Sequence, residues 1–154
     1  MNYLKFLNNK EKQKIVDKLN KQFGIKEIPG ILSMRGKERL FLFQGDLDAK
    51  QIKELEKTIP IERIGVYFAK TIAEEIKLSI EGIHLLKNQI TKNIYEINTK
   101  QMQQWMMGRE LDVQSGKKGF VIMKHDDDFL GSGKASEKKI TNFIPKNRRL
   151  KEKN

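Results

Sequence analysis

The sequence predicts an α+β protein, with a small α/β unit over residues 1–60 followed by a mostly β unit over residues 61–150. Two observations predict this fold. In the first part, two amphipathic segments with helix-capping signals flank a pair of short apolar runs. After Gly116, apolar runs of strand length alternate with glycine-containing turns. Residues 151–154 are expected to form a disordered tail.

The first helix is expected to begin after Asn8, whose side chain can cap it with Glu11 as the reciprocal partner. Apolar residues recur every four positions from Ile15 to Phe23 and form one stripe on the helix. Gly24 is the residue type that ends helices in the left-handed conformation. With the hairpin and second helix expected after it, this helix is expected to form a small α+β layer structure.

A β-hairpin and a second helix are expected next. The apolar runs Ile31–Met34 and Leu40–Phe43 are separated by a short glycine-containing turn, which is typical of a hairpin. Asp48 can cap a helix over Ala49–Thr58, and Pro60 would stop it.

The second unit is expected to be rich in strands. A helix capped by Asn98 or Thr99 should run to Met107 and end at Gly108. The Met and Trp residues of this helix, Trp105 among them, recur at helical spacing and indicate core packing rather than a cofactor site. Strands are expected at Ile64–Ala69, Ile76–Ile80, Ile94–Ile97, Gly119–Met123, Phe129–Lys134 and Lys138–Phe143.

Positive charge gathers near the carboxyl end. The chain has 31 basic and 20 acidic residues and a net charge of +11. Residues 113–154 hold 11 basic and 5 acidic side chains, a net +6, whereas residues 61–112 are neutral overall. Such clustering favours a polyanion as partner. The alternative is a lysine-rich surface that only keeps the protein in solution.

The composition excludes several kinds of chemistry. The absence of cysteine excludes thiol nucleophiles, thiolate metal sites and disulfides, and it favours a cytoplasmic location. No apolar run approaches the roughly 20 residues that a membrane helix needs, and the first residues do not resemble a signal peptide. We therefore expect no membrane partner.

Two short motifs suggest ligands but fail on their spacing. The run from Gly131 to Lys134 invites a phosphate-loop interpretation, yet Asp128 stands where the first glycine is needed and Ala135 where Ser or Thr is needed. Residues 126–128 are three adjacent aspartates that match no calcium-loop spacing and are expected in a hairpin turn. We therefore expect neither a metal nor a cofactor.

The segment from residue 116 to 149 combines features that suit RNA. Its glycines permit close approach of a sugar–phosphate backbone. Arginine offers a planar donor fork to phosphate, lysine a point charge, and asparagine amides can bond bases or 2′-hydroxyls. The candidate RNA-binding residues are Lys117, Lys118, Gly131, Gly133, Lys134, Lys138, Lys139, Asn142, Pro145, Lys146, Arg148 and Arg149.

The same segment resembles a known family. The runs G-F-V-I at 119–122, L-G-S-G-K at 130–134 and N-F-I-P-K-N-R-R at 142–149 look like the PUA-like RNA-binding domain attached to Nop/Sun-type RNA cytosine-C5 methyltransferases. The resemblance extends over about Ile61–Leu150. It implies a curved mixed β-barrel that binds structured RNA. The positions that match the family pattern are Gly131, Gly133, Lys134, Asn142, Pro145, Lys146 and Arg149. The two-part layout is also similar to small ribosome-biogenesis proteins that end in a PUA domain.

The chain departs from that family where catalysis is concerned. It shows no glycine-rich loop for S-adenosylmethionine. It also contains no cysteine, whereas the resemblance implies a cysteine nucleophile for cytosine methylation. We therefore expect no catalysis by this chain itself. The expected function is binding of rRNA or tRNA, in ribosome biogenesis or as a targeting module for an RNA-modifying enzyme or a ribosome-assembly factor.

Two other functions stay open at this point. The first is a protein–protein adaptor with a solubilising basic tail. The second is an enzyme built around an acidic pair such as Glu74 and Glu75, which would need a deep pocket and strongly shifted pKa values.

Overall fold

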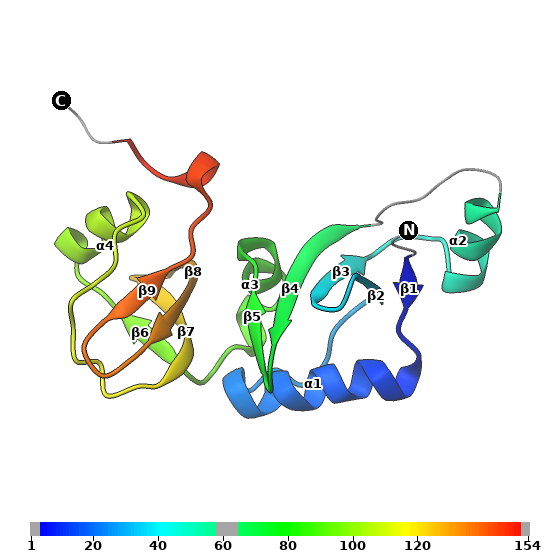
Figure 1. The fold of residues 1–154 in the computed structure, drawn as a ribbon, viewed down its shortest axis with the longest axis horizontal. Helices are drawn as coiled ribbons and strands as arrows, with labels where there is room; N and C mark the ends of the chain where they lie inside the picture. The colour runs from blue at the N-terminus through cyan, green and yellow to red at the C-terminus, as the bar shows by residue number, and fades with distance from the viewer. Residues whose placement is uncertain (1–3, 58–64, 152–154) are drawn as a thin grey trace.

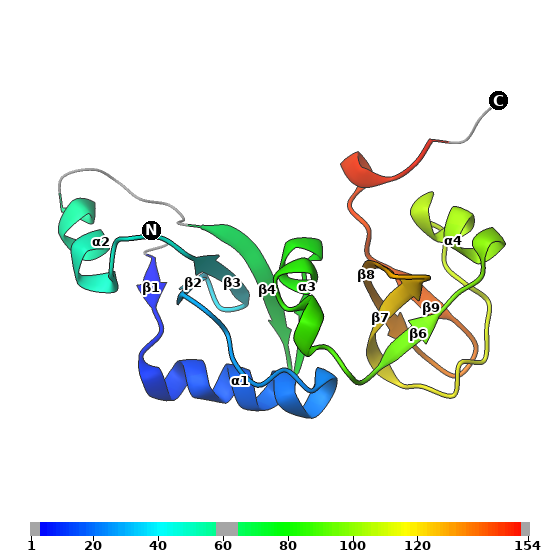
Figure 2. The ribbon, with the colours of Figure 1, turned by 180° about the vertical axis from the view of Figure 1, so that it is seen from behind.

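A computed structural model describes residues 4–57 and 65–151 of the chain. Within these residues, nine strands form a five-stranded and a four-stranded sheet, and helices pack beside them (Figure 1). The same arrangement is visible from behind in Figure 2. The predicted α+β class is confirmed.

The N-terminal sheet is antiparallel throughout, in the order β1-β2-β3-β4-β5. The β2–β3 hairpin is the one that the sequence predicts. The strands are β1 (Lys5–Phe6), β2 (Ile31–Arg35), β3 (Arg39–Phe43), β4 (Val66–Ile72) and β5 (Glu75–Leu78).

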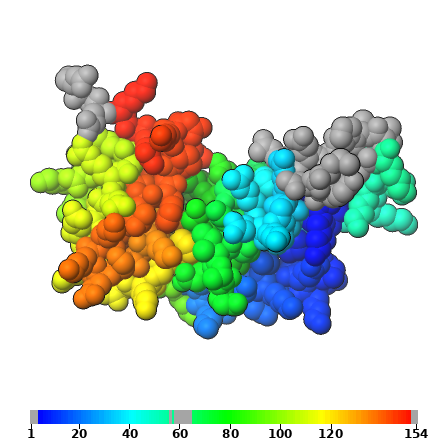
Figure 3. Space-filling model, in the orientation of Figure 1, coloured from blue at the N-terminus to red at the C-terminus, as the bar shows by residue number. Residues whose placement is uncertain are grey.

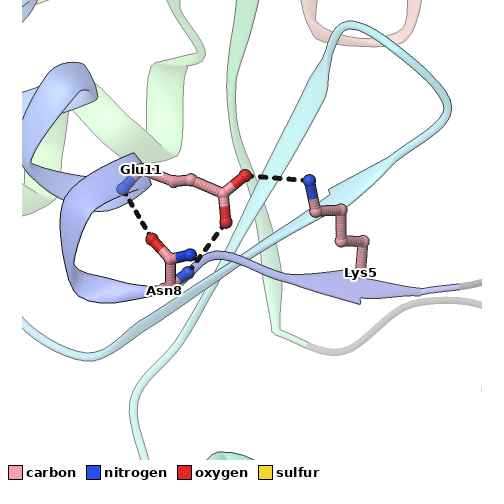
Figure 4. A network of polar contacts seen from close by, with 3 residues as sticks. All are labelled: Lys5, Asn8 and Glu11. Carbon is pink, nitrogen blue, oxygen red and sulfur yellow. Dashed lines mark hydrogen bonds and ion pairs between the residues drawn. The ribbon is translucent and has the colours of Figure 1, made fainter.

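Helix α1 (Asn9–Phe23) is held at its start by the predicted capping box. The side-chain oxygen of Asn8 accepts a hydrogen bond from the Glu11 amide at 2.8 Å, and the Glu11 carboxylate accepts one from the Asn8 amide at 3.1 Å (Figure 4). Lys5 of β1 pairs with the same carboxylate at 2.8 Å. Gly24 ends the helix with φ of 81°. The capping box therefore also fixes the helix to the edge of the sheet.

Helix α2 (Ala49–Glu56) begins at Asp48, whose carboxylate caps the Gln51 amide at 2.8 Å, and the Gln51 side chain reciprocates. The predicted start is therefore confirmed. The predicted last residue, Thr58, and the predicted stop, Pro60, lie outside the described residues.

The C-terminal sheet is mixed. Its order is β6-β7-β8-β9, with β6 parallel to β7 and the other pairs antiparallel. Helix α3 (Ile80–Leu85) and a 3-10 turn (Lys87–Gln89) lead into it, and a second 3-10 turn (Lys146–Arg148) follows it. Its elements are β6 (Ile94–Glu96), α4 (Thr99–Met106), β7 (Gly119–His125), β8 (Asp128–Ala135) and β9 (Ile140–Asn142).

The division between the two sheets differs from the predicted boundary at residues 60 and 61. Strand β4 pairs with β3 and with β5, so the two strands expected to open the second unit complete the N-terminal sheet instead. The strand expected at Ile76–Ile80 ends at Leu78, because the Ser79 hydroxyl accepts a hydrogen bond from the Gly82 amide at 3.0 Å and caps α3. The predicted start of the earlier strand, Ile64, lies outside the described residues.

The larger apolar core draws on both sheets. The α1 stripe and the inner faces of β2 to β5 pack together with Phe120, Ile122 and Phe129 of the C-terminal sheet. A smaller cluster surrounds Trp105, which is fully buried and donates its indole N–H to the Leu130 carbonyl at 2.8 Å. The prediction that Trp105 is a core residue is confirmed.

Candidate nucleic-acid interface

Three of the predicted lysines line one open hollow. Lys117 and Lys118 precede β7, and Lys134 lies on β8 directly opposite Phe120. The hollow, of about 1170 Å³, is also lined by the carboxylates of Glu75 and Glu137. The three cations therefore meet on one face although 16 positions separate Lys118 from Lys134 in the sequence.

Two aromatic rings connect this group to a lysine of the N-terminal sheet. The Lys134 ammonium lies 5.5 Å from the centre of the Phe120 ring, and the Lys77 ammonium lies 4.4 Å from the centre of the Phe143 ring. The two rings are 6.1 Å apart and tilted by 53°. Cations at these distances are attracted by the ring faces. We call these four residues, Lys77, Phe143, Phe120 and Lys134, the basic–aromatic strip.

Further predicted residues surround a small pocket at the Lys77 end of the strip. Gly131, Pro145 and Arg148 line this pocket of about 210 Å³ together with Lys77 and Phe143. Arg148 forms an ion pair with Glu81 of α3. The basic–aromatic strip therefore leads from Lys134 to the pocket that Arg148 lines.

Lys77 is held in an unusual electrostatic environment. Burial lowers the pKa of its ammonium, and the nearby charges of Lys70 and Arg39 lower it further. Among the described residues, no carboxylate forms an ion pair with Lys77. A half-buried cation with a ring on one side and positive neighbours on another is a ready partner for an anion.

Two other predicted residues, Gly133 and Asn142, have structural contacts that explain their identity. A Cβ on Gly133 would lie 2.6 Å from Ile140 and 2.9 Å from Trp105, so this glycine allows the close packing of the core. The Asn142 amide donates to the carbonyls of Trp105 at 2.8 Å and Arg109 at 3.0 Å. Both of its hydrogens are used within the protein.

Arg149 also faces the protein. Its Nε donates to the Ile144 carbonyl at 2.8 Å, and its side chain lies against Gly108, where any Cβ would collide with it. The guanidinium thus fixes the segment after β9 against the end of α4, and it differs in this from the exposed Arg148.

The remaining predicted lysines are exposed on loops. Lys138 and Lys139 lie in the turn between β8 and β9, and Lys146 lies in the last 3-10 turn. Lys139 forms an ion pair with Glu110 at 3.1 Å, which engages part of its charge.

Sequence reasoning did not select Lys77, although a signal for it was present. The alternation Ile76-Lys77-Leu78 places the lysine on the outward face of a strand. The sequence does not show that the Phe143 ring lies beside this lysine in the fold. Phe120 and Phe143 lay within the motif segments without an assigned role. Only the fold brings these three residues together.

The structure also locates residues of the other sites that the sequence suggested. No group of three or more His, Asp or Glu residues that could hold a metal occurs within residues 4–57 and 65–151. Asp126 and Asp127 form the predicted hairpin turn, and Asp128 begins β8. Glu74 is 94% exposed and lies 3.8 Å from Lys18, so no deep pocket encloses it. Across the described part of the chain, helices that combine the length and apolarity for a membrane crossing are absent.

The C-terminal segment is similar to a known protein family. Residues 92–150 match a family model described as the methyltransferase RsmF PUA domain. The resemblance to the PUA-like domain of this methyltransferase type is therefore confirmed over these residues. The match begins after the N-terminal sheet and α3, which agrees with the division that strand pairing shows.

Curated relatives extend the similarity into the N-terminal sheet. The ribosomal RNA small subunit methyltransferase F of Psychromonas ingrahamii is 27% identical over 142 residues, which are 88% of this chain and 28% of the relative. The protein of the same name from Shewanella woodyi is 29% identical over 141 residues, 90% of this chain and 28% of the relative. The chain thus spans little more than a quarter of the length of these relatives.

Proposed function

We propose that this chain, with its PUA-like C-terminal unit, is an RNA-binding module that acts in the modification or assembly of ribosomal RNA in the cytoplasm. Structured rRNA is the favoured ligand, and tRNA is the other candidate of the same class. Any methyl transfer would be catalysed by residues outside this chain, in an RNA-modifying partner. The family match at residues 92–150 and the names of the relatives support this proposal.

The observation that carries the proposal is the basic–aromatic strip. Its two ammonium groups lie 4.4 and 5.5 Å from ring centres, and among the described residues no carboxylate forms an ion pair with either, so their charge stays available to an external anion. Lysine contacts of this kind attract RNA phosphates and release counterions, which makes binding depend on salt. PUA-like binding of structured RNA would then depend on shape and phosphate contacts more than on sequence.

The test is a salt titration of binding to a hairpin RNA. For the unchanged protein, the logarithm of affinity should fall linearly with the logarithm of salt, with a slope of about −0.7 to −0.9 for each phosphate contact. Replacing Lys77 and Lys134 together with Gln should weaken binding at least about tenfold and make the slope shallower by about 1.4 to 1.8.

The matched control removes two positive charges elsewhere. Lys10 and Lys14 are exposed on α1, so the pair Lys10→Gln and Lys14→Gln has the same net charge as the strip variant. If both double variants lost affinity equally, net charge alone would explain binding and the strip would not be the contact surface. Absence of salt-dependent RNA binding in the unchanged protein would favour the protein–protein adaptor.

A further inference from the structure

Basic residues stand opposite one another across the N-terminal sheet. Arg39 of β3 pairs in register with Lys70 of β4, and Lys70 pairs with Lys77 of β5. Residues directly opposite in an antiparallel sheet project from the same face, and like charges there destabilise the sheet. Arg35 of β2 also pairs in register with Arg39, and such a series of cations needs an explanation other than folding. We call Arg39, Lys70 and Lys77 the basic row.

The row lies on the face of the sheet that α1 does not cover. Each residue of the row has a sequence neighbour that is buried in the core with α1. These neighbours are Leu40, Ala69 and Leu78. Successive side chains of a strand point to opposite faces, so the row points away from the helix. In Figure 3, the green surface of β4 and β5 lies between the cyan surface of β2 and β3 and the orange surface of the C-terminal strands.

Among the described residues, the charge of this face stays positive although Glu38 lies beside it. Glu38 lies 3.5 Å from Lys70 and forms an ion pair with it. Arg39 and Lys70 nonetheless disfavour the charged form of Lys77 and lower its pKa, after the larger effect of burial. The cations of the row therefore repel one another in the free protein, and an added anion would relieve that repulsion.

An aromatic side chain accompanies the row. Tyr67 is half-buried, lies 5.8 Å from Phe41 between ring centres, and lines the small pocket beside Lys77 and Phe143. Burial raises the pKa of its phenol, the positive charge of Arg39 lowers it, and the negative charge of Glu38 raises it. Sheets that bind single-stranded nucleic acid combine basic residues with such rings.

We infer that the basic row extends the RNA-binding surface across the N-terminal sheet and holds the phosphates of an unpaired RNA segment that continues from the structured RNA at the C-terminal unit. Lys77 belongs to both the row and the strip, which makes the surface continuous. Adjacent strands are about 4.8 Å apart, so the row is about 10 Å long and one side chain wide, which suits a single strand. The inference rests on the proposed function.

The experiment compares two RNAs on the full chain. One is a blunt hairpin, and the other is the same hairpin with an unpaired oligouridine extension of about 10 nucleotides. The extension should increase affinity at least about tenfold at 0.1 M salt, because the row adds phosphate contacts. Replacing Arg39 and Lys70 together with Gln should remove this gain and leave the affinity for the blunt hairpin unchanged.

The control is again Lys10→Gln with Lys14→Gln, which should keep the gain. If the extension adds no affinity, or if the Arg39 and Lys70 variant keeps the gain, the inference is wrong while hairpin binding still supports the proposed function. If neither RNA binds, the proposed function and the inference fall together. If polyglutamate binds the unchanged protein as tightly as the extended RNA and loses affinity in the same variant, the face docks an acidic protein and the RNA assignment is wrong.

Discussion

The ammonium of Lys77 lies 4.4 Å from the centre of the Phe143 ring, so a strand of the N-terminal sheet contacts the segment that follows the last strand of the chain. The two residues are 66 positions apart in the sequence. This contact places a cation from one sheet beside the cations of the other, and the expected RNA surface depends on it.

Replacing Lys77 with Met should leave the protein as stable as before, or more stable, near neutral pH. The change removes a cation that burial and two positive neighbours disfavour, while the new side chain keeps the packing against Phe143. Urea unfolding measures this directly. A large loss of stability would contradict the electrostatic account of this site.

The pH dependence of the same variant gives a second measurement. Because the pKa of Lys77 is lower in the folded protein than in the unfolded chain, the unfolded chain binds more protons between the two values. This difference makes stability rise with pH in that window. The stability advantage of Lys77→Met should therefore shrink as the pH rises from 7 toward about 10.5, and an advantage that grew over that range would contradict the direction of the shift.

Replacing Glu81 with Gln should strengthen RNA binding. The carboxylate forms an ion pair with Arg148 and competes with phosphate for that guanidinium. Its removal should raise hairpin affinity about two- to fivefold at low salt and make the salt slope steeper by up to about 0.9. Glu54→Gln, which frees Lys57 at the end of α2, is the control with the same charge change and should have a smaller effect. Equal gains in both variants would show that Arg148 is not at the interface.

Replacing Asn142 with Ala should cost stability and not RNA affinity. Two carbonyls lose their amide donor and the Ile144 amide loses its acceptor, which should cost about 1–3 kcal/mol. Urea unfolding measures the loss, and binding of the folded variant to hairpin RNA is measured in parallel. Asn147 is exposed and serves as the control position. A variant with unchanged stability and weaker binding would show that Asn142 contacts the RNA, as the sequence predicts.

Local signals in the sequence predicted most of the elements. The caps at Asn8 and Asp48 and the left-handed Gly24 depend on interactions within a few residues, and these features formed as predicted. The strand expected near residue 66 was also found, but its pairing with β3 was not predicted, because pairing between strands far apart in sequence leaves no local trace.

The sequence predicted several residues of the candidate site but not which side chains each of them contacts. Lys117, Lys118 and Lys134 meet on one face, whereas Gly133 and Arg149 serve the packing of Trp105 and the segment beside Gly108. A glycine that makes room for a tryptophan and a glycine that makes room for RNA look the same in a sequence. Only side-chain contacts distinguish them.

The core around Phe120, Ile122 and Phe129 has a consequence for any attempt to divide the chain. These side chains pack with residues of the N-terminal sheet, and the Ser132 hydroxyl donates to the Leu78 carbonyl of β5 at 2.8 Å. A fragment cut at residue 92 would uncover apolar surface and leave that hydroxyl without its acceptor. The two sheets should accordingly melt in one transition, and the PUA-like segment should aggregate when produced without the strands that precede it.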